Sequence, residues 1–271
     1  MYSGSTLTTF SGRILGAHQK IDRVARRHLQ HLAPGTHFPS IRRILHFEGG
    51  NGPDAIKRKS PAKDEPWHYF QPFDPKDINL LQQITSHYGL LVKALTRGDE
   101  VRAGFEAAWL AHAMVDGLTP AHHYPYEEKL IELRGGEGID SRTTVKAKIV
   151  LPGETKRELL ANNWKMWGPG GLMTSHGTFE WGVATAIVPL RFRLALPTEA
   201  EIEAFKEQDI AEWYRGIAQE VASLGLYDTF LKTGWTMKLT RAVRKELAPR
   251  IVRSVTLAWY GALYDARKRS S

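Results

Sequence analysis

Apolar residues recur through this chain at the spacing of an α-helix, and this periodicity constrains the fold more than any other feature. In residues 13–32 they occur at helical spacing and would share one helix face with His18: Ile14, Leu15, Ile21, Val24, Ala25 and Leu29. Similar patterns predict helices over 77–97, 100–117, 126–133, 154–166, 173–188, 199–223 and 239–269. Because strand signals are scarce and no segment repeats, we predict an all-α multi-helix bundle.

Proline and glycine indicate where the helices stop. Residues 33–75 are dense in Pro, Gly, His and charge without a sustained period, which predicts an irregular connection with at most short helices. Pro249 should interrupt or kink the last helix, because it lacks an N–H. With 271 residues the chain can bury one large core. We therefore expect a single domain over 1–271, in which residues 11–190 carry the candidate site and 199–269 complete the bundle.

The composition restricts the function. The chain has no cysteine, which excludes disulfides and thiolate metal sites. A formal net charge of +8 at pH 7 favours polyanionic partners such as nucleic acid or anionic lipid, although a merely solvated surface explains it equally well. The longest apolar stretch, 181–190, is too short for a transmembrane segment. The chain as given starts without a signal peptide, so we expect a cytoplasmic protein, or a secreted one if a leader has been removed.

The strongest chemical signal lies at the end of the predicted helix 100–117. His112, Asp116 and His122 occur there with the spacing HxxxDxxxPxH. His112 and Asp116 are four positions apart and would project from one face, where a single cation could bridge them. Pro120 stops the helix, and the following turn would bring His122 to the same end. Imidazole and carboxylate suit Zn²⁺. The alternative is that His112 packs in a helical core with Asp116 as its hydrogen-bond partner.

Other His and acidic residues occur at similar spacings. His176 and Glu180 repeat the i, i+4 geometry on another predicted helix, and Asp54 precedes His68 in the irregular connection. Each pair is weak evidence by itself, because this composition produces an HxxxD or HxxxE pattern about once by chance. The information lies in the order of the whole set: His18, Asp54, His68, His112, Asp116, His122, His176 and Glu180.

In this order and spacing, residues 11–190 resemble the bacterial zinc-dependent phospholipase C superfamily, which also includes zinc-dependent single-strand nucleases. The resemblance implies a helical bundle of that type, with long irregular loops and two or three zinc ions, that hydrolyses phosphodiesters. It assigns three sets of ligands: Asp54, His68, His112 and Asp116 to one zinc; His122, His176 and Glu180 to a second; and His18 with Asp116 to a third.

The chain departs from the family in two places. Family members complete the third zinc with an N-terminal tryptophan, whereas this chain begins Met1-Tyr2. A basic insertion near 134–160 also lengthens the segment before His176; its basic residues are Arg134, Arg142, Lys146, Lys148, Lys156 and Arg157. We expect a solvated loop there, with a lid or a polyanion-binding flap as the alternative.

Several roles stay open at this point. His46 could replace His68 as a ligand, and His123 could replace His122. Asp54 is our candidate for the catalytic residue that orients or deprotonates the attacking water, because its carboxylate would lie at the edge of the metal site. Asp54 could instead be a plain ligand or a turn-forming residue.

Zinc clusters suit phosphodiester hydrolysis for physical reasons. Several divalent ions with few carboxylates leave a net positive cavity that attracts an anionic diester. Zinc lowers the pKa of bound water to about 7, so hydroxide is available at neutral pH. Two close ions can share that hydroxide and a phosphoryl oxygen, while a third stabilises charge on the leaving oxygen.

Phospholipase C-like hydrolysis is the function that we predict first, because Glu180 and the spacing from Asp54 to His68 are closer to that branch of the superfamily. A single-strand nuclease is the alternative, for which Trp164 and Trp167 would supply stacking surfaces if exposed, although such aromatics more often lie in a core. A second alternative is a degenerate zinc-stabilised protein that binds lipid or polyanion without turnover.

The last predicted helix places basic residues beside an apolar stripe. The stripe comprises Leu239, Val243, Leu247, Ile251, Val255 and Leu257. Such a helix could make peripheral contact with an anionic membrane. We favour the other reading, in which the stripe packs on the bundle and the basic face lies in water.

Overall fold

Helices are the regular elements of the described part of the chain, which in this computed structural model is Met1 and residues 16–270. No strand occurs within those ranges, so the all-α prediction is confirmed. In the same residues, no helix is both long and apolar enough to cross a membrane. Ile14 and Leu15 of the predicted first helix lie outside the described residues.

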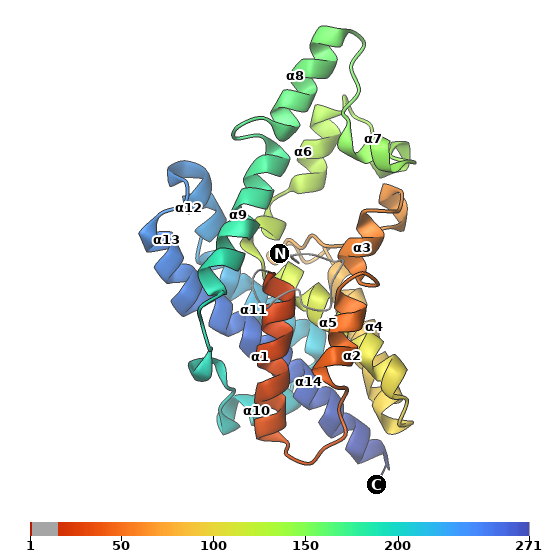
Figure 1. Cartoon of the computed structure of the whole chain (residues 1–271), viewed down its shortest axis with the longest axis vertical. Coiled ribbons are helices and arrows are strands. Elements are labelled where there is room, and N and C mark those ends of the chain that lie inside the picture. Colours follow the sequence, from red (N-terminus) through yellow and green to blue (C-terminus); the bar gives the residue numbers. More distant parts are fainter. Residues whose placement is uncertain (2–15, 271) are drawn as a thin grey trace.

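Four long helices form the body of the molecule (Figure 1): α1 (Ala17–Leu32), α4 (Asn79–Thr96), α5 (Glu100–Gly117) and α14 (Ala248–Ser270). Helix α4 packs along α5, and α14 packs against α1 and α4. Trp259 of α14 is fully buried between them and donates its indole N–H to the carbonyl of Ala107 on α5, at 3.1 Å. The apolar faces predicted from the sequence therefore meet in one core.

Helix α5 is buried along most of its length. Asp99 caps its N-terminus by accepting the backbone N–H of Arg102 at 2.9 Å. Alanines at 103, 107 and 111 are fully or almost fully buried and let neighbouring helices approach closely. Its C-terminal turn, which carries His112 and Asp116, therefore lies in the middle of the protein rather than on its surface.

Residues 33–75 contain only short helices, as predicted. They are α2 (Ile41–Glu48), α3 (Pro53–Lys57) and a 3-10 turn at Ala62–Asp64. The Ser40 side chain caps α2, which packs against α5 and α1. The segment that follows these helices brings the chain back to the end of α5, where Phe70 donates its backbone N–H to the carbonyl of His122 at 3.1 Å.

A second group of helices projects from the body along the long axis (Figure 1). After the 3-10 turn Pro120–His123 they are α6 (Tyr126–Leu133), α7 (Val145–Ile149), α8 (Lys156–Trp167) and α9 (Leu172–Ile187), with a further 3-10 turn at Ile139–Ser141. Tyr126, Leu130, Leu151 and Met166 form a small separate core in this group. Helix α8 lies farthest from the body, and α9 leads back into it.

The prediction of a single helix over 199–223 was wrong. The structure has two helices, α10 (Glu199–Lys206) and α11 (Ile210–Ser223). Asp209 separates them, because its carboxylate accepts two backbone N–H groups in the first turn of α11 and so starts a new helix. An aspartate at an N-cap competes with continuation of the preceding helix, and the apolar period alone did not reveal this.

The C-terminal region contains one helix that was not predicted, α12 (Leu226–Thr233). The predicted interruption of the last helix is present: α13 (Met237–Ala242) continues through a π-helical turn, Val243–Leu247, into α14. Pro249 lies just after this turn and cannot donate a helical N–H, which accounts for the widened hydrogen bonding. A short turn at Arg193–Ala195 joins α9 to α10.

The apolar stripe of the last predicted helix is buried. All six residues are less than a tenth exposed: Leu239, Val243, Leu247, Ile251, Val255 and Leu257. This face packs in the core, as the favoured reading of the sequence predicted. Membrane contact through this stripe is therefore not supported.

Candidate metal centre

Asp116 lies at the centre of the ligand-type residues that the sequence predicted. It is one turn after His112 on α5, and the Nε2 atom of His112 is 3.1 Å from Asp116 Oδ2. Helix α5 ends at Gly117, and the turn that contains Pro120 reverses the chain. His122 therefore returns to the same place, with Nδ1 at 3.9 Å from Asp116 Oδ1. The predicted arrangement of the HxxxDxxxPxH motif is present.

One group of ligand atoms comes from Asp54, His68 and His112, whose nitrogen and oxygen atoms lie within 4.8 Å of one another. Asp54 belongs to the first turn of α3, and His68 comes from the extended segment that follows. His68 Nδ1 is 2.6 Å from Asp116 Oδ2. The structure thus brings together the four side chains that the resemblance assigned to one zinc.

A second group consists of His122, His176 and Glu180, again with ligand atoms within 4.8 Å. Helix α9 presents His176 and Glu180 one turn apart, and Glu180 Oε1 is 3.1 Å from His176 Nε2 and 2.8 Å from His122 Nε2. The two imidazoles stack with centroids 4.9 Å apart. These are the three residues predicted for a second zinc.

The third predicted position also lies beside Asp116. His18, on the buried face of α1, has Nε2 at 3.2 Å from Asp116 Oδ1. The backbone amine of Met1 is 2.5 Å from the same oxygen and 3.1 Å from Glu180 Oε1. The Met1 amine thus lies beside the third predicted position, and Asp116 is close to members of all three groups.

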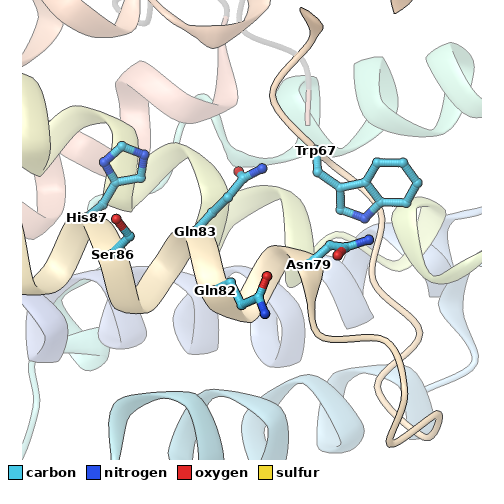
Figure 2. A pocket seen from close by; sticks show the side chains of 6 residues that line it. All are labelled: Trp67, Asn79, Gln82, Gln83, Ser86 and His87. Atoms are coloured by element: carbon cyan, nitrogen blue, oxygen red, sulfur yellow. The ribbon is translucent and has the colours of Figure 1, made fainter. Parts of the chain in front are cut away.

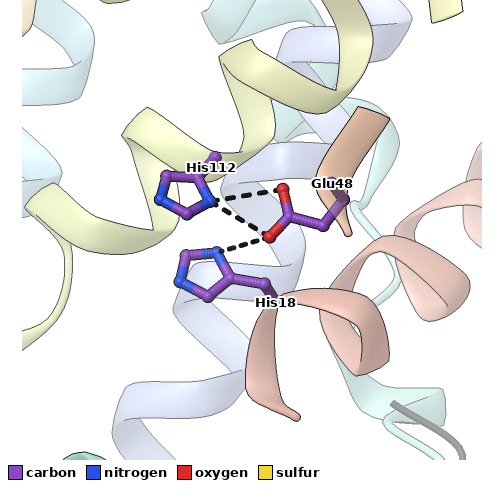
Figure 3. A group of neighbouring side chains, drawn as sticks. All are labelled: His18, Glu48 and His112. Atoms are coloured by element: carbon purple, nitrogen blue, oxygen red, sulfur yellow. Dashed lines mark hydrogen bonds and ion pairs between the residues drawn. The ribbon is translucent and has the colours of Figure 1, made fainter. Parts of the chain in front are cut away.

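Glu48 was missed in the sequence. It ends α2, is fully buried, and accepts a hydrogen bond from His112 Nδ1 at 3.0 Å. His18 Nδ1 faces the same carboxylate at 3.6 Å, and the two imidazoles stack with centroids 4.1 Å apart (Figure 3). Both rings therefore turn Nδ1 toward Glu48 and Nε2 toward Asp116. No His or acidic residue lies four positions from Glu48 in the sequence, so no spacing motif marks it. Only its burial in the structure shows that it belongs to the site.

This arrangement indicates how Glu48 acts. The ligand atoms of His18, Glu48 and His112 are close enough to hold an ion by themselves. However, a carboxylate that accepts the Nδ1 proton of an imidazole fixes the tautomer in which Nε2 is free to bind a metal. Because both rings direct Nε2 toward Asp116, Glu48 fits better as their shared support than as a ligand.

The charges in the cluster favour metal-binding protonation states. Burial lowers the pKa of His68 to about 4, assisted by Lys57, and that of His122 to about 3, assisted by the Met1 amine. Burial would raise the pKa of Asp116, but the Met1 amine and the surrounding imidazoles hold it well below its usual range. Neutral imidazoles and ionised carboxylates are the forms that ligate metals.

His112 differs from the other two histidines. Burial would lower its pKa, but the carboxylates of Glu48 and Asp116 raise it well above the ordinary value. The protonated ring thus balances part of the negative charge of these two carboxylates. A divalent cation placed among the same carboxylates would take over this role.

The buried imidazole nitrogens provide a test of whether a metal fits. Among the described side chains, His68 Nε2 is buried without a hydrogen-bond partner, while His18 Nε2 and His112 Nε2 face the Asp116 carboxylate at 3.2 and 3.1 Å. An unpaired buried polar atom costs about 1–3 kcal/mol, so the nitrogen of His68 requires an explanation. Imidazole nitrogen together with carboxylate oxygen and no thiolate is a donor set that suits Zn²⁺. The residues therefore fit zinc.

A cavity of about 550 Å³ opens above the cluster. The body and the projecting helices both line it, with Asp54, His68, Asp116, His122, His176 and Glu180 on one side and apolar side chains on the other: Leu130, Ile139, Val145, Ile149, Met166 and Met173. Lys57 lies at its edge; burial would lower its pKa, but Asp54 and Glu65 raise it, so it stays a cation.

Part of the basic insertion near 134–160 forms a wall of this cavity. Arg142 is buried and pairs with Glu127, and the Lys148 amine bonds to Glu65 and to the backbone of Lys57. Both cations line the cavity. The expectation of a merely solvated loop was therefore wrong for these positions, because charged groups at 134–160 hold the wall to the rest of the site.

Two alternative ligands lie elsewhere. His46 is exposed on α2 and contacts Asn51. His123 bonds to the carbonyl of Gly117 and faces a different pocket. Neither reaches the ligand cluster.

A further pocket lies along α4 (Figure 2). Five residues of α4 and Trp67 line it, and the α4 residues carry amide, hydroxyl and imidazole groups: Asn79, Gln82, Gln83, Ser86 and His87. Its histidine already bonds to the buried Glu106 at 2.6 Å. The pocket shares Trp67 with the metal cavity, but none of the predicted ligands lines it.

Comparisons with known proteins find a likeness in structure. No family model matches the chain. No curated protein matches it either. A solved structure of Clostridium perfringens alpha-toxin, isolated from an avian strain, aligns with 98% of this chain at 15% identity and a TM-score of 0.46. The chain spans 66% of the length of that solved chain. A likeness of this size assigns neither a family nor an activity.

Proposed function

We propose that this protein is a metal-dependent phosphodiester hydrolase of the phospholipase C type that binds two or three zinc ions. One observation carries the proposal: three groups of imidazoles and carboxylates meet at Asp116, on the side of a cavity whose opposite wall is apolar. A single structural ion would need only four ligands. The eight predicted ligands support more than one ion in an accessible site.

The ligand sets follow the groups of side chains. Asp54, His68, His112 and Asp116 would hold one ion; His122, His176 and Glu180 a second; and His18 with Asp116, beside the Met1 amine, a third. Such ions supply Lewis acidity and a water of lowered pKa. The chain itself supplies charge: Asp116 and Glu180 keep their carboxylates ionised, and their neighbouring imidazoles stay neutral at His68 and His122.

Asp54 is the residue that we propose for orienting the attacking water. In the group formed with His68 and His112, Asp54 is the partly exposed residue and lines the cavity, whereas the two histidines are buried. Burial would raise the pKa of Asp54, but the charges of His112, His18 and His68 lower it. An ionised carboxylate at the solvent side can accept a hydrogen bond from water and fix its direction.

The cavity favours a phospholipid over a nucleic acid. Apolar side chains from α6, α7, α8 and α9 face the ligand groups, which suits a phosphodiester with hydrocarbon substituents. The aromatic residues nearest the ligands, Tyr69 and Tyr126, already stack on each other with centroids 5.1 Å apart. They are therefore less available to stack on bases, as a single-strand nuclease would require.

Lys57 should bind the phosphate of the substrate. We expect Lys57→Gln to lower kcat/KM for an anionic diester about tenfold or more, because hydrogen bonds to charged groups contribute about 1.5–3 kcal/mol. The effect should be measured by steady-state hydrolysis of a chromogenic phosphodiester. Lys59→Gln, an exposed lysine of the same segment outside the cavity, is the matched control and should leave kcat/KM unchanged. Equal losses in both variants would contradict the role of Lys57.

The function is tested by elemental analysis and hydrolysis on one sample. We expect two to three zinc per chain, and turnover of the chromogenic diester that is lost on chelation and restored by zinc. Phosphatidylcholine should be cleaved faster than single-stranded DNA; the reverse order would favour the nuclease. Zinc without turnover of any diester would indicate a degenerate binding protein, and no stoichiometric metal would exclude the hydrolase.

A further inference from the structure

The far end of the molecule carries an exposed apolar surface that the metal centre does not use. Helix α8 is described in full, and Met166 is its one buried residue. Leu160 and Trp164 are 69% and 67% exposed, and Trp167 and Ile149 are about half exposed. Large apolar side chains gathered on one surface of a globular protein indicate an interaction site.

These side chains form a stripe rather than a scatter. Leu160, Trp164 and Trp167 are spaced i, i+4, i+7 and so share one face of α8. Trp167 donates its indole N–H to the carbonyl of Ile149 at 2.8 Å, which joins α7 to the end of the stripe. We call Leu160, Trp164, Trp167 and Ile149 the tip surface. In Figure 1 α8 projects beyond the body of the protein, so a flat surface could reach it.

The charge around the tip surface is positive. Lys146, Lys156, Arg157 and Lys165 are exposed on or beside α7 and α8, against two exposed acidic residues there, Glu154 and Glu158. Basic residues at the border of an apolar stripe complement anionic lipid headgroups, each contributing about a fivefold gain in binding. Tryptophan suits the same boundary, since its ring is apolar and its N–H is polar.

The tip surface is also continuous with the cavity. Trp167 and Ile149 belong to the tip surface and also line the cavity. A lipid that leaves a bilayer at the tip surface would therefore meet the apolar wall before it reaches the ligand groups.

We propose that the tip surface docks on anionic phospholipid membranes. Leu160 and Trp164 insert at the level of the headgroups, and the lysines and arginine around them bind the anionic surface. The docking does not depend on turnover, so it can be tested separately from the proposed hydrolysis.

Co-sedimentation of the full chain with vesicles of equimolar phosphatidylglycerol and phosphatidylcholine tests this docking. We expect Leu160→Glu and Trp164→Ala each to weaken binding about tenfold or more, because each removes a large inserted apolar side chain. Lys156→Glu should weaken binding to these vesicles but not to pure phosphatidylcholine. The matched controls are Leu194→Glu and Trp181→Ala, which change side chains that are 92% and 55% exposed elsewhere, and both should bind normally.

Hydrolysis of a soluble chromogenic diester separates this proposal from the proposed function. Leu160→Glu should retain the wild-type rate on that substrate while losing vesicle binding. Wild-type vesicle binding in both tip variants would overturn the docking, as would equal losses in the two controls. A concentration-dependent dimer that Leu160→Glu abolishes, with vesicle binding unchanged, would also overturn it and assign the surface to a second copy of the chain.

Discussion

Asp116→Asn should lower both bound zinc and kcat/KM for a phosphodiester by more than about 100-fold. Even residues that only support a metal ligand typically cost 10–100-fold in affinity or activity, and Asp116 is placed to contact the ions directly. Its Oδ1 faces the Met1 amine and His18, and its Oδ2 faces His68 and His112. Asparagine has the same size but no charge, and its NH₂ group would face donors.

Asp99→Asn is the matched control for this variant. Asp99 lies at the opposite end of the same helix, where it caps α5, and asparagine is an equally good N-cap. Zinc content by elemental analysis, kcat/KM and thermal unfolding should be measured on both variants. Full zinc and full activity in Asp116→Asn would exclude the proposed metal cluster.

Glu48→Gln should weaken zinc binding about 10–100-fold without removing a ligand. Glutamine can accept one N–H through its carbonyl, but its NH₂ group cannot accept another, and the negative charge that polarises His112 is lost. His18 and His112 would then be free to turn Nε2 away from Asp116. Competition with a chromophoric chelator measures the affinity, and saturating zinc should restore most of the turnover.

Glu106→Gln provides a closely matched comparison. Glu106 is another fully buried glutamate, and it accepts a hydrogen bond from His87 Nδ1 at 2.6 Å, outside the metal cavity. This variant should lose stability, since Arg102 also pairs with Glu106, but it should bind zinc as the wild type does. Equal weakening of zinc binding by both substitutions would mean that Glu48 acts through general stability.

Local spacing predicted the all-α class and the His/acid pairs on α5 and α9, whereas the family resemblance supplied His18, Asp54 and His68. A helix places residues four apart on one face, so the pairs on α5 and α9 follow from their positions in the chain alone. Pro120 predicted the turn that returns His122 to the cluster. Which of His46 and His68 joins the others depends on how the irregular connection folds, and local spacing contains no information about this.

Other features depend on contacts between distant segments. Glu48 interacts with α1 and α5 only after α2 has packed against them, and no local pattern distinguishes it from a surface glutamate. Trp164 and Trp167, expected more often in a core, are exposed because α8 packs mainly against α9 and α6 and buries little of its surface. Asp209 interrupts a helix that the apolar period had joined, because its side chain competes with the backbone for hydrogen bonds.

The eight candidate ligands come from segments far apart in the sequence, on α1, α3, α5 and α9 and in the connections after α3 and α5. Ions shared among them would act as cross-links, each closing a long loop of chain. Ions that bind only the folded state stabilise it in proportion to the logarithm of their free concentration. In a chain without thiols, zinc would then cross-link distant segments, as disulfides do in other proteins. A chelator would remove these cross-links and lower the stability of the fold, as a reductant does in a disulfide-bonded protein.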